Sequence, residues 1–219
     1  MTRIRVHNMT MSLDGYAAGP DQDLEHPLGT GGERLHEWIF ETATFRRTYG
    51  DRSDGPPEEG LDDEFARLGD DEVGATVIGR NMFGPVRGPW PDEEWTGWWG
   101  DIPPYHHPVF VVTHHERAPL EMAGGTTFHF VTDGVEAAVE QAVAAAGGLD
   151  VRIGGGVQVL QQCLRAGLVD EMHLAIAPVL LGGGERLFDR LDGGPHGMEV
   201  AEMVSSTRVT HVRLVRATP

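Results

Sequence analysis

The sequence changes structural type around one cluster of glycines, at residues 154–156, and this cluster most constrains the fold. Val151 and Ile153 before it are short, apolar and β-branched, which predicts a strand that the glycines end. After it, apolar side chains recur at helical spacing, and residues 172–176 then alternate with strand spacing. The stretch 150–188 therefore predicts strand, glycine turn, helix and strand, followed by a second glycine turn.

Gly154, Gly155 and Gly156 have both a functional and a structural interpretation. A backbone without Cβ atoms at the start of a helix lets a phosphate approach the N–H groups and the positive end of the helix dipole. A tight strand-to-helix turn would use the same glycines without any ligand. From these residues alone, both interpretations stay open.

A second strand-to-helix turn is predicted at Gly79 and Arg80, directly after the apolar residues 75–78. The guanidinium group of an arginine presents a fork of donors that suits a fixed phosphate. The alternative is an arginine that is simply solvated at a strand end.

Composition limits the class of protein. The chain has 219 residues, 40% of them hydrophobic and 23% charged, which is typical of a soluble globular protein that forms one domain, residues 1–219. Its net charge of −17 argues against nucleic acid and anionic membranes as partners. The N-terminus has no apolar leader and no window approaches 18 apolar residues, so we expect a cytoplasmic protein.

Neither the cysteine nor the histidines indicate a metal centre. Cys163 is the single cysteine and lies on the predicted helix after the glycine turn, where we expect a small buried side chain. His106 and His107 are adjacent, so on an extended chain they point opposite ways, and no thiol or carboxylate cluster accompanies them. We therefore predict no metal site.

The remaining elements complete an α/β pattern with a mixed sheet. A turn-rich span at 192–198 precedes an alternating C-terminal stretch, 199–216, which predicts antiparallel strands. Further strands are predicted at 3–11, 75–78, 109–113 and 127–131, and helices at 32–48 and 135–146.

Ser12 to Tyr16, which include an Asp-Gly pair, follow the first predicted strand and begin a long loop. Such a loop can act as a flap across a bound ligand. Asp14 is the first candidate for a polar group at a reacting centre, and a turn-forming aspartate is the alternative. Glu37, on the first predicted helix, is the second candidate, and a solvated helix face is its alternative.

Residues 84–108 are rich in Gly, Pro and Trp, and they hold four of the five tryptophans. A loop with so much apolar surface must pack against something. The candidates are a partner subunit, the body of the domain and a substrate pocket.

Taken together, these stretches resemble the dihydrofolate reductase-like fold, and more closely its branch with the reductase domain of bacterial riboflavin biosynthesis and related stand-alone proteins. The likeness implies a three-layer α/β fold with a central mixed, mostly parallel sheet flanked by helices. The matching segments are residues 12–16, 78–80, 154–156, 168–174, 178–182 and 187–188.

The resemblance implies that NADPH binds at the carboxyl ends of the core strands. It implies four groups of cofactor contacts: Ser12, Gly15 and Tyr16 beside the nicotinamide; Gly79, Arg80, Asn81 and Met82 at the first turn, where the arginine meets the adenosine 2′-phosphate; Thr113, His114 and His115 near the adenosine; and Gly154, Gly155, Gly156, Val157 and Gln158 on the pyrophosphate.

Three departures from the family leave the substrate open. The zinc deaminase signature that usually accompanies the riboflavin enzyme is absent. The pterin-binding carboxylate of true dihydrofolate reductases has no secure counterpart among His36, Glu37 and Glu41. The insertion at 84–108 resembles neither branch.

We therefore expect an NADPH-dependent reductase that transfers hydride to a small heterocycle, with a riboflavin-pathway phosphoribosylamino-pyrimidine as the leading substrate. One alternative is a nucleotide-binding module without turnover, used in regulation or assembly. Others are a dihydrofolate reductase, or a reductase that uses a flavin or deazaflavin. The resemblance and the apolar loop also lead us to expect a homodimer.

Overall fold

The computed structural model describes residues 2–50, 55–84, 87–92, 94–191 and 197–217. The chain divides into two compact units, each built from two segments. The first unit comprises Met1–Arg5 and Glu72–Val169, and the second comprises Val6–Asp71 and Asp170–Pro219. Strand β1 (Ile4–Ser12) contributes its first two residues to the first unit and the rest to the second.

In the first unit, a largely parallel sheet has the strand order β1-β7-β3-β4-β6-β5. Neighbouring strands run parallel except at β5, which is antiparallel to β6. The strands are β3 (Val73–Gly79), β4 (Pro108–Val112), β5 (Leu120–Glu121), β6 (Thr127–Val131) and β7 (Asp150–Gly155). The helical segments are α4 (Arg80–Phe83), η2 (Ala123–Gly125), α5 (Val135–Ala145) and α6 (Val157–Arg165).

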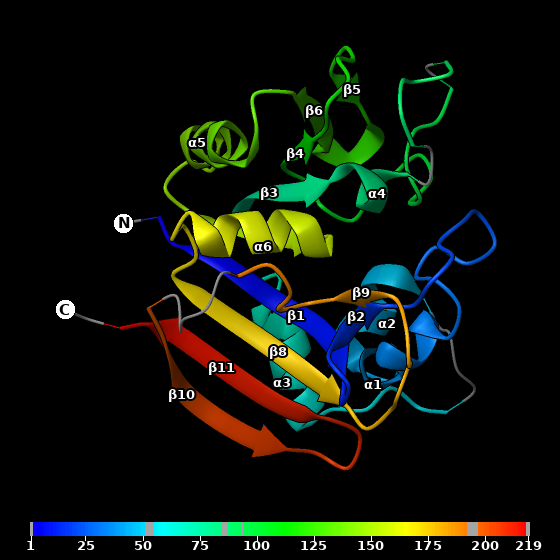
Figure 1. Cartoon of the computed structure of the whole chain (residues 1–219), viewed down its shortest axis with the longest axis vertical. Helices are drawn as coiled ribbons and strands as arrows, with labels where there is room; N and C mark the ends of the chain where they lie inside the picture. The colour runs from blue at the N-terminus through cyan, green and yellow to red at the C-terminus, as the bar shows by residue number, and fades with distance from the viewer. Residues whose placement is uncertain (1, 51–54, 85–86, 93, 192–196, 218–219) are drawn as a thin grey trace. The chain divides into compact units, whose positions relative to one another are not determined.

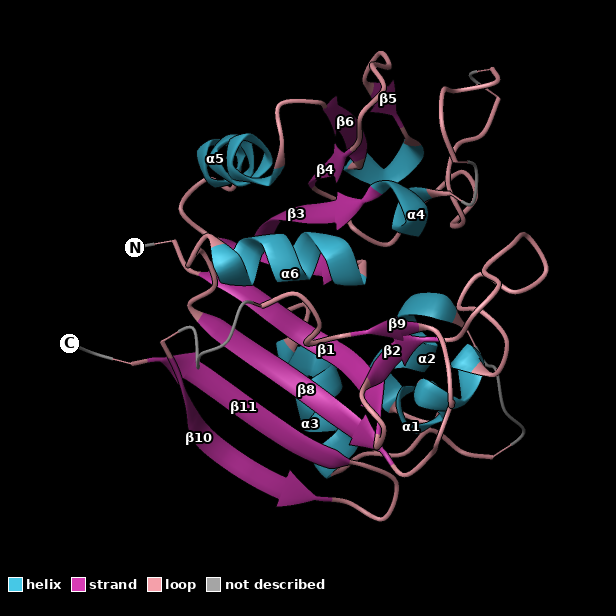
Figure 2. Cartoon of the chain, in the orientation of Figure 1, coloured by secondary structure: helices cyan, strands magenta, loops and turns pink. Residues whose placement is uncertain are grey.

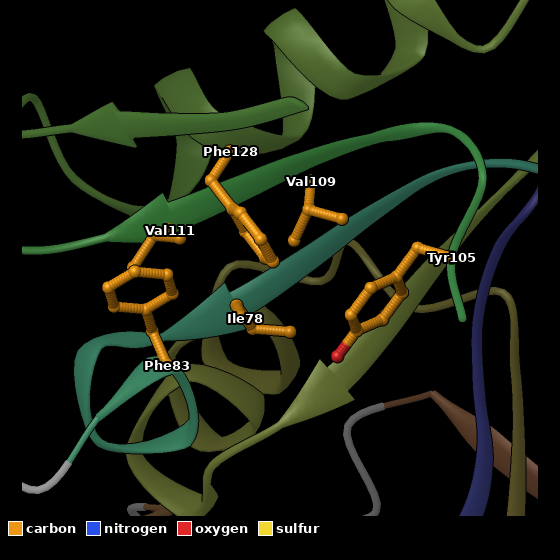
Figure 3. Packing of buried hydrophobic residues seen from close by; sticks show 6 residues of the cluster. All are labelled: Ile78, Phe83, Tyr105, Val109, Val111 and Phe128. Atoms are coloured by element: carbon orange, nitrogen blue, oxygen red, sulfur yellow. The ribbon is translucent and has the colours of Figure 1, made fainter. Parts of the chain in front are cut away.

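Residues buried on both faces explain why β3 and β4 read as continuous apolar runs. Helices α5 and α6 pack against these central strands, as Figure 1 shows for α6 beside β3. A separate buried cluster contains Ile78, Phe83, Tyr105, Val109, Val111 and Phe128, which point toward one another in Figure 3.

In the second unit, the strand order is β10-β11-β8-β1, and β11 runs antiparallel to both of its neighbours (Figure 2). The strands are β8 (Glu171–Ala177), β10 (Met198–Ser205) and β11 (Thr210–Arg216), with β2 (Tyr16–Ala18) and β9 (Glu185–Arg186) as a separate small ribbon. The helices are η1 (Gly32–Leu35), α1 (Glu37–Phe40), α2 (Ala43–Tyr49) and α3 (Leu61–Leu68). Leu35, Trp38, Ala175, Ala177 and Val209 form a buried core here.

The predicted α/β fold, with a mostly parallel sheet and antiparallel C-terminal strands, is confirmed. The predicted single helix at 32–48 is wrong, because the chain forms η1, α1 and α2 instead. Thr42 causes the second break: its backbone is extended, and its hydroxyl accepts a hydrogen bond from the Phe45 N–H as the N-cap of α2. Of the predicted turn-rich span at 192–198, residues 192–196 lie outside the described chain.

The Trp-rich insertion packs against the body of the first unit, which was one of its three candidate partners. Trp90, Trp95 and Trp99 are partly buried against the cluster of Figure 3. The Trp95 indole N–H also donates to the Phe83 carbonyl at 2.9 Å, and a side chain at Gly84 would collide with this indole. Residues 85, 86 and 93 of the insertion lie outside the described chain.

Candidate cofactor site

Three turns of the first unit follow the carboxyl ends of neighbouring parallel strands. Gly79 lies opposite Val112 in the register of β3 and β4, and Ile78 lies opposite Gly155 in that of β3 and β7. The turns that begin at Gly79, Thr113 and Gly155 therefore meet at one edge of the sheet. Ligands of open α/β sheets bind at this edge.

The two predicted glycine turns are in contact. A Cβ atom at Gly79 would lie 3.1 Å from the Val159 Cγ2 methyl and 3.3 Å from the backbone nitrogen of Gly156. Gly155 has φ +127°, a conformation that favours glycine, and the Gly155–Gly156 peptide bond is cis. Glycine at these positions lets the ends of β3 and β7 approach each other closely.

Gly156 faces open space at the start of α6. Apart from Gly156 itself and its two chain neighbours, no atom of the described chain would lie within 4 Å of a Cβ atom there. Helix α6 is nine residues long, and its N-cap residue, Gly156, makes no side-chain capping hydrogen bond. Of the two residues that follow, Val157 is buried and Gln158 is exposed. An uncapped helix start beside a glycine with open space above it can accept a phosphate group.

Arg80 holds a positive charge that has no acceptor among the described residues. Its three guanidinium nitrogens are buried and have no hydrogen-bond partner there. Burial, with a smaller contribution from the charge of Arg117, lowers the Arg80 pKa to about 10. The group is still a cation at neutral pH, and a buried cation without an acceptor favours an anion as its ligand. Asn81 and Met82, the next two residues, are half-buried.

Trp90 connects the Arg80 turn to the end of β4. Its ring lies against the Arg80 guanidinium, with Cζ 3.1 Å from the ring centroid. Its indole N–H donates to the His115 carbonyl at 3.1 Å, and the His115 N–H donates to the buried Thr113 hydroxyl at 3.2 Å. His114 is exposed. The structure thus brings together the predicted contacts on Gly79–Arg80 and on Thr113–His115.

The flap residues belong to the second unit and form an ordered turn. The buried Ser12 hydroxyl accepts a hydrogen bond from the Tyr16 N–H at 2.9 Å. Gly15 has φ +87°, and its N–H donates to the Ser12 carbonyl at 3.0 Å. The guanidinium of Arg186 lies over the Tyr16 ring, 4.5 Å from its centroid. These contacts fix the loop; a role beside the nicotinamide stays a prediction.

Asp14 fastens the flap to the segment after β8. Its carboxylate accepts hydrogen bonds from the Leu181 N–H at 3.1 Å and the Gly182 N–H at 2.7 Å. The Ser12 hydroxyl, and then these backbone donors, lower the pKa of Asp14 to about 2. Asp14 is therefore ionised at neutral pH and can accept a hydrogen bond but not deliver a proton. Its placement at the reacting centre stays a prediction.

Glu37 lies on the wall of a pocket within the second unit. The pocket has a volume of about 200 Å³, and its lining includes Trp38, Arg34 and Arg208 besides Glu37. Arg208 is ion-paired with Glu58 at 2.7 Å. Glu41 binds Arg46 at 2.7 Å instead and does not line the pocket. Of these two carboxylates on the helical segment, Glu37 is thus the one open to a ligand. Its catalytic role stays a prediction.

Among the described residues, no group of three or more His, Cys, Asp and Glu side chains is placed to hold a metal ion. In the same part of the chain, no helix is both long and apolar enough to cross a bilayer. Cys163 is buried, and burial raises the pKa of its thiol to about 12, so it is not a reactive nucleophile.

Sequence reasoning missed Trp90 and Arg117 as neighbours of Arg80. Arg117 follows the end of β4, at the same sheet edge as Arg80, and its guanidinium lies 4.9 Å from the Trp90 ring centroid. Arg117 lies five residues beyond the end of β4, and no sequence pattern marks it as a neighbour of Arg80. For Trp90, the composition of the loop predicts that its tryptophans pack against something, but it does not predict that this indole lies against Arg80.

The fold is shared with several solved structures. A protein from Shewanella sp. PV-4 with a proposed role in riboflavin biosynthesis is 23% identical, covers 100% of both chains and has a TM-score of 0.59. A pyrimidine reductase-like protein from Corynebacterium diphtheriae is 15% identical, with 100% of this chain and 93% of that chain covered and a TM-score of 0.56.

A bifunctional diaminohydroxyphosphoribosylaminopyrimidine deaminase/5-amino-6-(5-phosphoribosylamino)uracil reductase from Thermotoga maritima is 13% identical, with a TM-score of 0.54. The alignment covers 99% of this chain but 57% of the bifunctional protein. A comparison with curated proteins finds no match. The family model of the RibD C-terminal domain matches residues 5–210, so the chain belongs to the RibD C-terminal domain family.

Proposed function

We propose that this protein is an NADPH-dependent reductase whose substrate is a phosphoribosylamino-pyrimidine or a closely related heterocycle. The observation that carries the proposal is the buried guanidinium of Arg80, which lacks an acceptor in the described chain and lies at the same sheet edge as an uncapped, glycine-lined helix start. Family membership supports the reductase class.

The residues present fit a phosphorylated dinucleotide. Arg80 would bind the 2′-phosphate, because that group alone distinguishes NADPH from NADH and needs a cation. The N–H groups at the start of α6 would hold the pyrophosphate over Gly156, where a Cβ atom would fill the space. The turn at Thr113–His115 would lie along the adenosine. When bound, NADPH would supply the hydride, and the protein would position the reactants and exclude water.

The pocket of Glu37 supports a substrate that combines a polar ring with an anionic group. Glu37 can accept a hydrogen bond from a ring N–H, and Arg34 places a cation in the same pocket, while Arg208, which also lines it, is ion-paired with Glu58 at 2.7 Å. A phosphoribosyl group needs a local cation, here Arg34, because the whole chain carries a net charge of −17. At about 200 Å³ the pocket would take part of such a substrate, since pockets for whole ligands start at roughly 300 Å³.

The test has two stages. Calorimetry on the purified protein with NADPH, NADH and FMN identifies the cofactor. Absorbance then follows NADPH oxidation with the deaminated phosphoribosylamino-pyrimidine, its dephosphorylated form and dihydrofolate as substrates. We expect NADPH binding and turnover of the phosphorylated pyrimidine.

Each alternative has its own outcome in this experiment. Tight NADPH binding without oxidation of any substrate would support a nucleotide-binding module. Turnover of dihydrofolate alone would identify the other branch of the fold. Binding of FMN and not of NADPH would replace the proposed cofactor by a flavin.

We also propose that the protein acts as a homodimer on small molecules. The resemblance to its family supports a dimer. The Trp-rich loop adds no support, because Trp90, Trp95 and Trp99 pack against their own unit. Light scattering on the eluted protein tests this assembly, and a monomer across the accessible concentration range would reject it.

A further inference from the structure

Trp90 is itself held in place from several sides. Its indole N–H donates to the His115 carbonyl at 3.1 Å. Its ring meets Phe130 edge-on at 5.2 Å between centroids and Phe83 at 5.9 Å. A fixed indole ring therefore lies with its centroid 3.1 Å from the Arg80 Cζ and restricts where that guanidinium group can lie. The indole covers a face of the guanidinium, so an acceptor would have to lie in the guanidinium plane, at the edge that carries the N–H donors.

A second cation shares the same aromatic surface. The Arg117 Cζ lies 4.9 Å from the Trp90 ring centroid, 5.1 Å from that of Phe130 and 5.6 Å from that of Phe83. The charge of Arg117 lowers the pKa of Arg80, so the two guanidinium groups repel each other. Two like charges gathered around one indole are stabilised when an anion lies between them.

We propose that Trp90 and Arg117 complete, with Arg80, a clamp for a phosphomonoester dianion, and that these two residues set the preference for NADPH over NADH. The inference rests on the proposed function, because the dianion is the cofactor's 2′-phosphate. Such a group carries roughly −1.5 to −2 charges at neutral pH, which two arginines match and one does not. Trp90 is a positioning residue that acts through Arg80, whereas Arg117 contributes charge directly.

The experiment measures the ratio of the dissociation constants for NADH and NADPH by calorimetry on the full chain. The variants are Trp90→Leu, Trp90→Phe and Arg117→Gln. Adenosine 2′,5′-bisphosphate and 5′-AMP serve as probes of the adenosine half without nicotinamide. We expect Arg117→Gln and Trp90→Leu to weaken NADPH and the bisphosphate about tenfold while NADH and 5′-AMP change less than about twofold. Trp90→Phe keeps an aromatic face and should retain most of the preference.

Trp98→Leu is the matched control. Trp98 lies in the same loop and meets Trp95 edge-on with 4.9 Å between ring centroids, whereas Trp90 is the tryptophan whose ring lies against the Arg80 guanidinium. Its replacement should leave the NADH-to-NADPH ratio as in the wild type. Circular dichroism establishes that each variant is folded, and if Trp90→Leu is not, Arg117→Gln decides alone.

The outcomes separate the inference from the proposed function. If the wild-type protein does not bind NADPH, the proposed function fails. If the wild type prefers NADPH and Arg117→Gln and a folded Trp90→Leu keep that preference, the clamp is wrong while the function stands. If they weaken NADH and NADPH equally, the two residues support the fold of the turn and not the recognition of the phosphate.

Discussion

A Cβ atom on Gly79 would lie 3.3 Å from the backbone nitrogen of Gly156, so the turns that end β3 and β7 are in direct contact. The two glycines nevertheless differ in what surrounds them. The space around Gly79 is filled by Val159 and Gly156, whereas the space above Gly156 is open. This difference separates a glycine that packing requires from a glycine that a ligand would require.

Gly156→Ala should weaken NADPH binding without destabilising the protein. The backbone of Gly156 has φ −76°, which alanine adopts readily, and its Cβ would meet no described atom within 4 Å. Replacing a glycine at such a position leaves stability unchanged or raises it by about 0.4–1 kcal/mol. A methyl group where the pyrophosphate would lie should displace the cofactor and cost on the order of a hundredfold in activity. Calorimetry and thermal unfolding measure the two effects.

Gly79→Ala provides the contrast. Its Cβ would lie 3.1 Å from the Val159 methyl, and overpacking of this kind costs about 1–3 kcal/mol. We expect a lower melting temperature in this variant. Unchanged NADPH affinity in folded Gly156→Ala would show that no phosphate binds over this turn.

Arg80→Ala should weaken NADPH far more than NADH. Hydrogen bonds to a charged group contribute about 1.5–3 kcal/mol, so the loss for NADPH should be roughly ten- to a hundredfold. NADH lacks the phosphate and should change little. Arg87→Ala is the control, because Arg87 is an exposed arginine of the neighbouring loop. Equal weakening of NADPH and NADH binding would show that Arg80 does not bind the 2′-phosphate.

The turns at the sheet edge could be predicted because their chemistry is local. Gly79 and the glycines at 154–156 each directly follow the apolar residues of their own strand, so each turn is visible in a short stretch of sequence. Parallel strands then bring their carboxyl ends to one edge of the sheet. The C-terminal antiparallel strands were predictable for the same reason, since their alternation is visible in the sequence.

Contacts between distant residues could not be predicted. The backbone donors that bind the Asp14 carboxylate, Leu181 and Gly182, lie more than 160 residues away along the chain. The aromatic cover of Arg80 depends on how an irregular loop folds back, which no periodicity encodes. The predicted helix at 32–48 failed because Thr42 prefers a capping role to a place in the helix interior.

Asp14→Asn should lower kcat/KM severalfold without altering the shape of its pH profile. The Asp14 pKa is about 2, so the carboxylate stays ionised from pH 5 to pH 9. Its titration therefore causes no rise or fall of kcat/KM in this range. Asparagine offers one acceptor oxygen where both carboxylate oxygens now bind N–H groups, so the segment at Leu181 and Gly182 would loosen. Rate measurements from pH 5 to pH 9 on both proteins test this.

The control for Asp14 is Asp23→Asn. Asp23 is another carboxylate of the second unit that accepts backbone N–H groups, here from Glu25 and His26. If an acid limb of the wild-type profile disappears in Asp14→Asn and persists in Asp23→Asn, Asp14 is a proton donor after all and its low pKa is wrong.

A chain of buried hydrogen bonds in the second unit ends at Asp62. The Asn8 N–H donates to His173 Nδ1 at 3.2 Å, His173 Nε2 lies 2.9 Å from His211 Nδ1, and His211 Nε2 lies 2.7 Å from Asp62 Oδ1. Because Nδ1 of His173 accepts, its Nε2 carries the proton and donates to His211, which in turn donates to the carboxylate. This order requires a neutral His173.

We therefore expect acid to destabilise the protein through His173. Burial, and then the nearby His211 and His7, lower its pKa from 6.5 to about 2 in the folded state. Below pH 6.5 the unfolded chain binds a proton that the native protein does not, so the free energy of unfolding falls as pH falls, by up to about 1.4 kcal/mol per pH unit.

Urea unfolding of the wild type and of His173→Gln, at intervals between pH 7 and pH 4.5, tests this. The variant should be less stable at pH 7, but its free energy of unfolding should depend less steeply on pH, by the equivalent of about one proton. His114→Gln, at an exposed position, should keep the wild-type slope. An unaltered slope in His173→Gln would mean that the buried chain tolerates a proton, contrary to the donor order its geometry imposes.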